Sequence, residues 1–254
     1  MDSGEIFLLL VLLAWLGSLA VHFFGRLFEA APLTCAPRPR LILAAIFAFA
    51  LAAHWVVAVG FAPANVRTEP GIQALFVVAH ALLALAATHA MAALGLSAIE
   101  DGIERNNEAA RIAIGAVWLA LGICATGAEL GEGDSVVTFF APLVMSALTL
   151  LALAAAFSAG SRAFAAITQE RDRAAGIRFA GLALGWSLPL AQAAHGDWVS
   201  LAATAIDFAR ELPLLLAMLA LALVVERRSP TPRYSWVAAG CLVALGAVAW
   251  RWRP

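Results

Sequence analysis

Apolar residues occur along this chain in long runs that short polar segments separate. Eight of these runs are long enough to cross about 30 Å of hydrocarbon as α-helices. Proline marks several of the connections, as at Pro37 and Pro39 after the first run and at Pro230 and Pro232 after the seventh. The pattern predicts an all-α integral membrane protein with about eight transmembrane helices, at residues 5–25, 41–62, 72–96, 109–128, 136–161, 174–195, 199–225 and 235–252.

Composition supports a membrane protein and excludes some other classes. Hydrophobic residues make up 63% of the chain and charged residues only 13%, which is unusual for a water-soluble domain. No segment is polar enough for a separate soluble domain, so we expect a single transmembrane domain over residues 1–254. The net charge is -1 and the chain has no basic patch, so nucleic acid is not expected as a partner. The expected partners are the lipid bilayer and, beyond it, other membrane proteins or a second copy of the chain.

Arginine is distributed unevenly between the two sides of the predicted bundle. The connections after the odd-numbered helices hold most of the arginines, whereas the other side carries acidic residues such as Glu129, Glu132 and Asp134. By the positive-inside rule, the arginine-rich side is cytoplasmic. An even number of helices then leaves both termini on the outer side.

One stretch of the chain occurs twice. The segment ERNNEAARIAIGAVWLALG, from Glu104 to Gly122, is followed 65 positions later by ERDRAAGIRFAGLALG, from Glu170 to Gly185. This spacing equals about two membrane crossings with their connections, so it predicts parallel two-helix repeats. The units are expected at about 1–62, 72–131, 136–197 and 199–254, and the middle two carry the pattern most clearly.

These two segments resemble the repeated element of a bacterial inner-membrane family, the YjfL-like family catalogued as domain of unknown function 350. The resemblance covers roughly residues 72–228, and the second unit departs from it with Asp172 where the first has Asn107. It implies a repeat fold in the bacterial inner membrane, with both termini then periplasmic, and no established activity. The matching positions are Asn107, Ala109, Ala110 and Gly115 in one unit and Ala174, Ala175, Gly181, Gly185 and Pro189 in the other.

The repeated motif also has a direct structural interpretation. Small residues such as Gly115, Gly181 and Gly185 let helix backbones approach closely, which is a main source of packing energy in a bilayer. Asn107 and Asp172, each placed just before a pair of alanines, are expected to be N-caps.

Charged residues inside the predicted helices are candidates for a polar pathway. Asp207, Arg210 and Glu211 follow at i, i+3 and i+4, so Asp207 can face both partners. They form either a neutralised ion pair near the outer interface or the lining of an ion or proton pathway. Arg111 and Arg178 lie one turn into their helices and are expected to reach cytoplasmic headgroups, or alternatively to contact an anion or a lipid headgroup inside the bundle.

Histidines offer an alternative chemistry. His54 and His80 lie at similar depth on neighbouring antiparallel helices, so they are expected to be able to meet. His22 and His89 form a second such pair, and two bis-His pairs are compatible with haem b ligation. The other interpretation is that these are buried, hydrogen-bonded structural histidines.

Soluble enzyme chemistry has no motif in this chain. A P-loop, an HExxH motif and a nucleophile elbow are all missing from the sequence, and no catalytic residue is assigned. The acidic segment GAELGEGDS is expected to be solvated, with a divalent cation as the alternative. We therefore expect a non-enzymatic channel-like, transporter-like or membrane-complex scaffold component without a metal or cofactor. The alternative is a membrane redox protein that binds haem b through His54 and His80.

Overall fold

The computed structural model describes residues 38–131, 136–195, 200–228 and 232–251, together with isolated positions between 7 and 25. The helix expected at 5–25 lies for the most part outside the described residues, as do His22, Glu132 and Asp134. The described part of the chain is helical, with no strand in it.

Seven long helices form the described part of the molecule. All but the last are long and apolar enough to cross a membrane, and the last has a shorter apolar stretch, Tyr234–Val248. The all-α architecture is therefore confirmed, and the six candidate spans in the described ranges indicate a multi-pass membrane protein. These helices are α2 (Arg38–Gly60), α4 (Pro70–Ala93), α5 (Glu108–Leu130), α6 (Val136–Gly160), α8 (Arg173–Ala194), α9 (Leu201–Arg227) and α10 (Pro232–Arg251).

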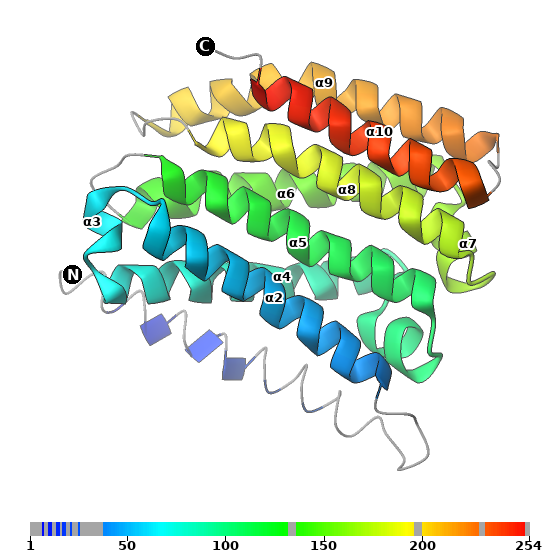
Figure 1. Cartoon of the computed structure of the whole chain (residues 1–254), viewed down its shortest axis with the longest axis horizontal. Coiled ribbons are helices and arrows are strands. Elements are labelled where there is room, and N and C mark those ends of the chain that lie inside the picture. The colour runs from blue at the N-terminus through cyan, green and yellow to red at the C-terminus, as the bar shows by residue number, and fades with distance from the viewer. Residues whose placement is uncertain are drawn as a thin grey trace.

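The long helices lie in two layers (Figure 1). Helices α2, α5, α8 and α10 lie side by side in chain order and form one layer, and α4, α6 and α9 form the layer behind it. The α5–α8 and α8–α10 pairs have the most extensive contacts. Helices α5 and α8 therefore form the centre of the bundle.

Helices α5 and α8 run parallel with their backbones in contact. Near their starts, a Cβ atom on Gly176 would lie only 2.7 Å from the carbonyl oxygen of Ala109. Near their ends, a Cβ atom on Gly127 would overlap the backbone of Ala191. Contacts at both ends keep the two helices close over their whole length, as is typical where small residues line a membrane interface.

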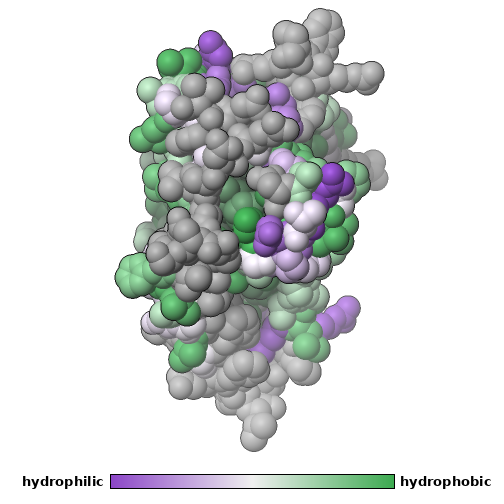
Figure 2. Space-filling view, turned by 90° about the vertical axis from the view of Figure 1, so that its left-hand side faces the viewer, coloured by the Kyte–Doolittle hydropathy of each residue, from purple (hydrophilic) through white to green (hydrophobic). Residues whose placement is uncertain are grey.

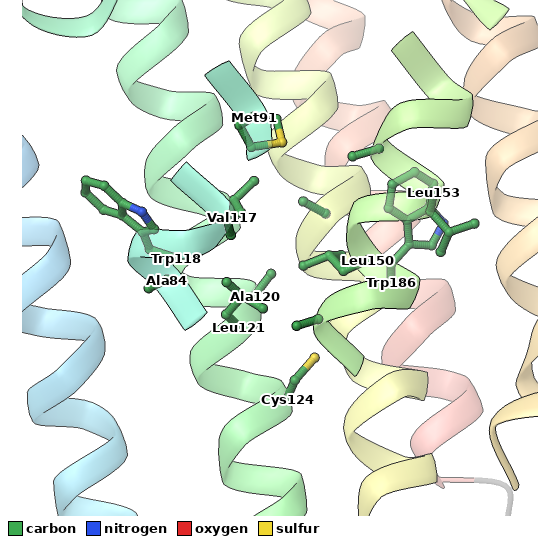
Figure 3. Close-up of a cluster of buried hydrophobic side chains, with 14 of the residues drawn as sticks. Ala84, Met91, Val117, Trp118, Ala120, Leu121, Cys124, Leu150, Leu153 and Trp186 are labelled. Carbon is green, nitrogen blue, oxygen red and sulfur yellow. The ribbon is translucent and has the colours of Figure 1, made fainter. Parts of the chain in front are cut away.

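The hydrophobic core lies between the two layers (Figure 3). Trp118 of α5 and Trp186 of α8 lie on opposite sides of this cluster, with Leu121 and Leu150 between them. Both indole N–H groups are satisfied, because Trp118 donates to the Thr88 hydroxyl at 2.8 Å and Trp186 to the carbonyl of Leu215 at 3.2 Å. The bundle thus buries its largest side chains without leaving these polar groups unpaired.

Short helices connect the long ones at both ends. At one end α3 (Ala64–Arg67) joins α2 to α4, and at the other end η1 (Ala98–Glu104) and α7 (Ala163–Thr168) lead into α5 and α8. Figure 2 views the molecule from the α3 end, where hydrophilic and hydrophobic residues both reach the surface. Exposed apolar side chains along the helices, such as Phe49 of α2 and Leu216 of α9, suit a bundle that faces lipid.

The connections before α5 and α8 have the same local structure 65 positions apart. Their short helices begin at Ala98 and Ala163. Asn106 and Arg171, which precede the long helices by two residues, have positive φ values of 50° and 55°. The next residue in each case, Asn107 or Asp172, donates its backbone N–H to a carbonyl six residues earlier, at 3.0 and 2.9 Å respectively. Positive φ is uncommon for residues other than glycine, so a matched pair is informative.

Candidate functional site

The charged residues of α9 separate onto two faces. Arg210 donates to Asp207 at 2.8 Å, and both side chains are well exposed. Glu211 is buried, at 3% exposure. The structure therefore pairs Asp207 with Arg210 on the outer face and places Glu211 on the inner one, so the three charges do not share one face of the helix.

Arg178 does not reach the lipid headgroups. Its guanidinium donates from Nε and Nη2 to the two carboxylate oxygens of Glu226, at 2.5 and 2.9 Å, and from Nη1 to Ser235 at 2.9 Å. The side chain is only 6% exposed. The prediction that it extends to the headgroups is therefore wrong, because α9 and α10 supply a bidentate carboxylate and a hydroxyl inside the bundle.

Arg111 is likewise held by the protein. Its Nη1 donates to the carbonyl of Gly102 and to the side-chain oxygen of Asn106, both at 2.9 Å. It therefore closes the connection between η1 and α5, and its contact with headgroups stays a prediction.

The two predicted N-caps are confirmed. The side chain of Asn107 accepts a hydrogen bond from the N–H of Ala110, and that of Asp172 accepts one from Ala174. Asn107 also donates from Nδ2 to the carbonyl of Ile167 at 2.6 Å, which links the start of α5 to α7. The side-chain amide of Asn107 therefore also links two helices. Asp172 cannot make the equivalent bond, because a carboxylate has no N–H to donate.

The glycines of the repeated motif lie at helix contacts. A Cβ atom on Gly115 would meet the Ile46 side chain at 3.1 Å, and one on Gly181 or Gly185 would meet the backbone of α10. The prediction of close helix approach is confirmed. The remaining alanines of the motif are buried as well, namely Ala109, Ala110, Ala174 and Ala175.

A buried polar cluster joins three spanning helices near the α3 end. His54 of α2 and Glu129 of α5 lie 3.0 Å apart between Nε2 and Oε2, and neither side chain is exposed. The ring of His80 from α4 meets the His54 ring edge to face, with centroids 5.1 Å apart. We call these three residues the His–Glu cluster.

Helix direction explains why these residues meet. Because α2 and α5 run parallel, His54 and Glu129, which both lie in the last third of their helices, come to the same depth. Helix α4 follows α2 through α3 and runs the other way, so its first half, with His80, reaches that depth too. Gly122 makes room for His80, since a Cβ atom there would lie 3.0 Å from Cε1 of the imidazole.

The cluster lies in apolar surroundings and is incompletely hydrogen-bonded. The ring of Phe139 stacks against that of His54, with centroids 6.5 Å apart. Although Nε2 of His54 and Oε2 of Glu129 are 3.0 Å apart, both ring nitrogens of His54 and of His80 and both carboxylate oxygens of Glu129 lack a well-oriented hydrogen bond to any described residue. Ionisable groups inside a membrane are costly and are therefore candidates for function.

The segment GAELGEGDS, which was expected to be solvated, is in part the end of helix α5. Helix α5 continues to Leu130, so Glu129 is a helical residue at 1% exposure and is not part of a solvated loop. The residues 132–135 lie outside the described residues. A signal for this burial was present, because Gly115, Gly122 and Glu129 follow at intervals of seven and share one helix face.

The geometry of the two histidines does not fit haem between them. Bis-His ligation needs the imidazoles on opposite sides of one iron with the macrocycle between them. The rings of His54 and His80 instead touch edge to face, and Oε2 of Glu129 lies 3.0 Å from Nε2 of His54. Within the described residues, no three His, Cys, Asp or Glu side chains are arranged to hold a metal ion.

Comparison with known proteins identifies no relative of the chain. No family model, curated protein or solved structure matches it. The strongest functional evidence is therefore the His–Glu cluster itself.

Proposed function

We propose that the chain is a multi-pass protein of the bacterial inner membrane, built from parallel two-helix repeats, in which the His–Glu cluster exchanges protons in a transporter-like or channel-like activity. The observation that carries the proposal is the contact of 3.0 Å between two fully buried ionisable side chains, His54 and Glu129, inside spanning helices.

Two structural features support the repeat. The connections before α5 and α8 match in their short helices, positive φ residues and caps at a spacing of 65 positions. The second helices of the units, which are α2, α5, α8 and α10, form a single layer. Arginines gather at the end that η1 and α7 occupy, which the positive-inside rule assigns to the cytoplasm. The His–Glu cluster then lies toward the periplasmic side.

The proton chemistry follows from the two groups. An imidazole and a carboxyl group in contact can pass one proton between Nε2 and Oε2 without any change in the net charge of the pair. His80 lies beside His54 as a further group that can accept or donate a proton. Such a chain of exchangeable groups is what a proton relay through a membrane requires.

Burial and contact with several helices favour this site over the charges of α9. Asp207 and Arg210 are exposed and neutralise each other, which is the arrangement of a surface ion pair. The His–Glu cluster instead connects α2, α4 and α5. A movement of α2 relative to α5 would therefore change the distance over which the proton passes.

The test is proton flux into proteoliposomes that contain a pH-sensitive dye, driven by a potassium diffusion potential with valinomycin. Wild-type protein should acidify the lumen faster than empty liposomes do. Glu129→Gln should reduce the rate to that of empty liposomes, because an amide cannot take up and release the proton. Asp207→Asn is the matched control, since it also removes one carboxylate, and it should leave the rate unchanged.

Folding has to be checked beside the flux. Each variant should elute from size exclusion as the wild type does and keep its far-ultraviolet circular dichroism. Glu129→Asp keeps a carboxyl group on a shorter side chain, so we expect an intermediate rate. Wild-type flux equal to that of empty liposomes, or a loss in Asp207→Asn with none in Glu129→Gln, would refute the assignment of the site.

A further inference from the structure

A mainly polar cavity of about 720 Å³ lies at the α7 end of the bundle (Figure 1). The last residues of α6 and α9, the short helix α7 and the first two turns of α8 surround it. Because the cavity is formed at helix ends, it suits the level of the interfacial region and not that of the hydrocarbon core. Its volume is within the range of about 300–1,000 Å³ that holds small molecules.

Charged side chains of both signs line this cavity in equal numbers. They are three arginines and three carboxylates, namely Arg162, Arg178, Arg227, Glu170, Asp172 and Glu226. A ligand with an excess of one charge would leave a group of that sign unmatched, and an unmatched charge away from bulk water is costly. The balance of charges therefore favours a ligand that carries one group of each sign.

The floor and the rim of the cavity have different roles. On the floor, Arg178 and Glu226 are almost fully buried and are paired with each other. At the rim, Arg162, Arg227 and Glu170 are exposed, and none of them forms an ion pair with a described residue. The rim therefore has groups of both signs available to a ligand.

The available groups define the chemistry of the ligand. The two rim arginines can bind the oxygens of one phosphate group through charge-assisted hydrogen bonds. Glu170 and Asp172, whose side chain is 39% exposed, can accept hydrogen bonds from an ammonium group. A trimethylated ammonium has no N–H to donate and is typically bound by aromatic rings, and none of the described residues that line the cavity is aromatic. The favoured ligand is a phosphate joined to a primary ammonium group.

The surface of α9 beside the cavity indicates that this ligand is part of a lipid. Val224 lies one turn before Arg227 on the same face of α9, and Leu216 lies two turns before Val224. Their side chains are 45% and 53% exposed, respectively. They form an apolar path from the cavity towards the hydrocarbon core, on which an acyl chain can lie while the headgroup occupies the cavity.

We propose that this cavity binds the ethanolamine headgroup of a phospholipid, with the phosphate held by Arg162 and Arg227 and the ammonium group held by Glu170 and Asp172. Arg178 keeps its partners inside the bundle and forms the floor beneath the headgroup. The site shares no residue with the His–Glu cluster, so the proposal goes beyond the proton exchange and is independent of it.

The test is native mass spectrometry of the full-length, detergent-purified and lipid-depleted protein with dihexanoyl phospholipids that differ only in the headgroup. Wild-type protein should bind one molecule of the ethanolamine lipid about tenfold more tightly than the choline lipid, which cannot donate hydrogen bonds to the carboxylates. The glycerol lipid lacks the ammonium group and should bind as weakly as the choline lipid. Glycerophosphoethanolamine has the same headgroup without acyl chains and should not displace the lipid at equal concentration.

Variants at the exposed rim change the charge of the cavity without touching its buried floor. Arg227→Gln removes one partner of the phosphate and should weaken binding of the ethanolamine lipid about tenfold. Arg228→Gln, at the next residue of α9 and outside the cavity wall, should leave it unchanged. Glu170→Gln gives the cavity an excess of positive charge and should reverse the preference towards the anionic glycerol lipid. Glu104→Gln removes an exposed carboxylate outside the cavity and should keep the wild-type preference.

A preference for the ethanolamine lipid that Glu170→Gln reverses supports the proposal. Equal binding of the three lipids by wild-type protein, or unchanged binding in both Arg227→Gln and Glu170→Gln, would overturn it. Displacement by glycerophosphoethanolamine would assign the cavity to a soluble zwitterion and overturn the lipid as its source. None of these measurements depends on proton flux, so a failure here is distinguishable from a failure of the proposed proton exchange.

Discussion

The α5–α8 contact makes a sharp prediction for Gly176→Ala. A Cβ atom at position 176 would lie 2.7 Å from the carbonyl oxygen of Ala109 and 3.0 Å from its Cα. Both are backbone atoms of α5, which no rotamer change can move aside. To restore ordinary van der Waals contact, which begins at 3.4 Å, the two helices must separate.

The size of the effect follows from two opposing terms. Alanine in a helix is favoured over glycine by about 1 kcal/mol. Overpacking in a close-packed interior typically costs about 1–3 kcal/mol. Gly240→Ala isolates the first term, because Gly240 lies in α10 with no atom within 4 Å of its added Cβ. We therefore expect Gly176→Ala to be about 1–3 kcal/mol less stable than Gly240→Ala.

Equilibrium unfolding in mixed micelles of a mild detergent and sodium dodecyl sulfate, followed by circular dichroism, measures this difference. Gly240→Ala should unfold at the same or a higher mole fraction of the denaturing detergent than wild type. Gly176→Ala should unfold at a lower one than Gly240→Ala. Equal stability of the two variants would show that α5 and α8 are not in backbone contact at this point, and the argument for their packing would fail.

Three further predictions concern other parts of the molecule. Arg178→Met leaves the Glu226 carboxylate without its partner and should lower stability by about 3–5 kcal/mol in the same assay, with Arg178→Met/Glu226→Met recovering much of the loss. Asn107→Ala removes a cap worth about 0.5–2 kcal/mol and the bond to Ile167, whereas Asn107→Asp keeps the cap and should cost less. The absorption spectrum of the purified protein, before and after dithionite, should lack a Soret band; a band that His54→Phe abolishes would contradict the geometry of the two rings.

The helices could be predicted from the sequence because each follows from a local pattern. Long apolar runs place seven of the expected spans within a few residues of the described helices. The caps at Asn107 and Asp172 were also predictable, since a side-chain acceptor before a helix bonds to amides only two or three residues away. Local chemistry of this kind needs no knowledge of the fold.

The partners of buried charges could not be predicted in the same way. Glu226 lies 48 residues from Arg178, and nothing in either segment indicates that they meet. The expectation that Arg178 reaches the headgroups holds for a single helix surrounded by lipid. In the bundle, α8 packs against α9 and α10, and these helices supply the partners of the guanidinium. The prediction for Glu129 was wrong for a related reason. The acidic residues that follow it are typical of a solvated loop, and only its position on the same helix face as Gly115 and Gly122 indicates burial.

The different contacts on the two sides of α5 also determine which part of the bundle is free to move. Towards α8 the contact is between backbones, at Gly176 and Gly127, and it resists any change in helix separation. Towards α2 the contact is through a flexible side chain, with Ile46 against Gly115. Helix α2 can therefore tilt if side chains such as Ile46 change rotamer, while α5 and α8 keep their relative position. Because His54 is on α2 and Glu129 is on α5, such a tilt would change the separation of the two groups that exchange the proton.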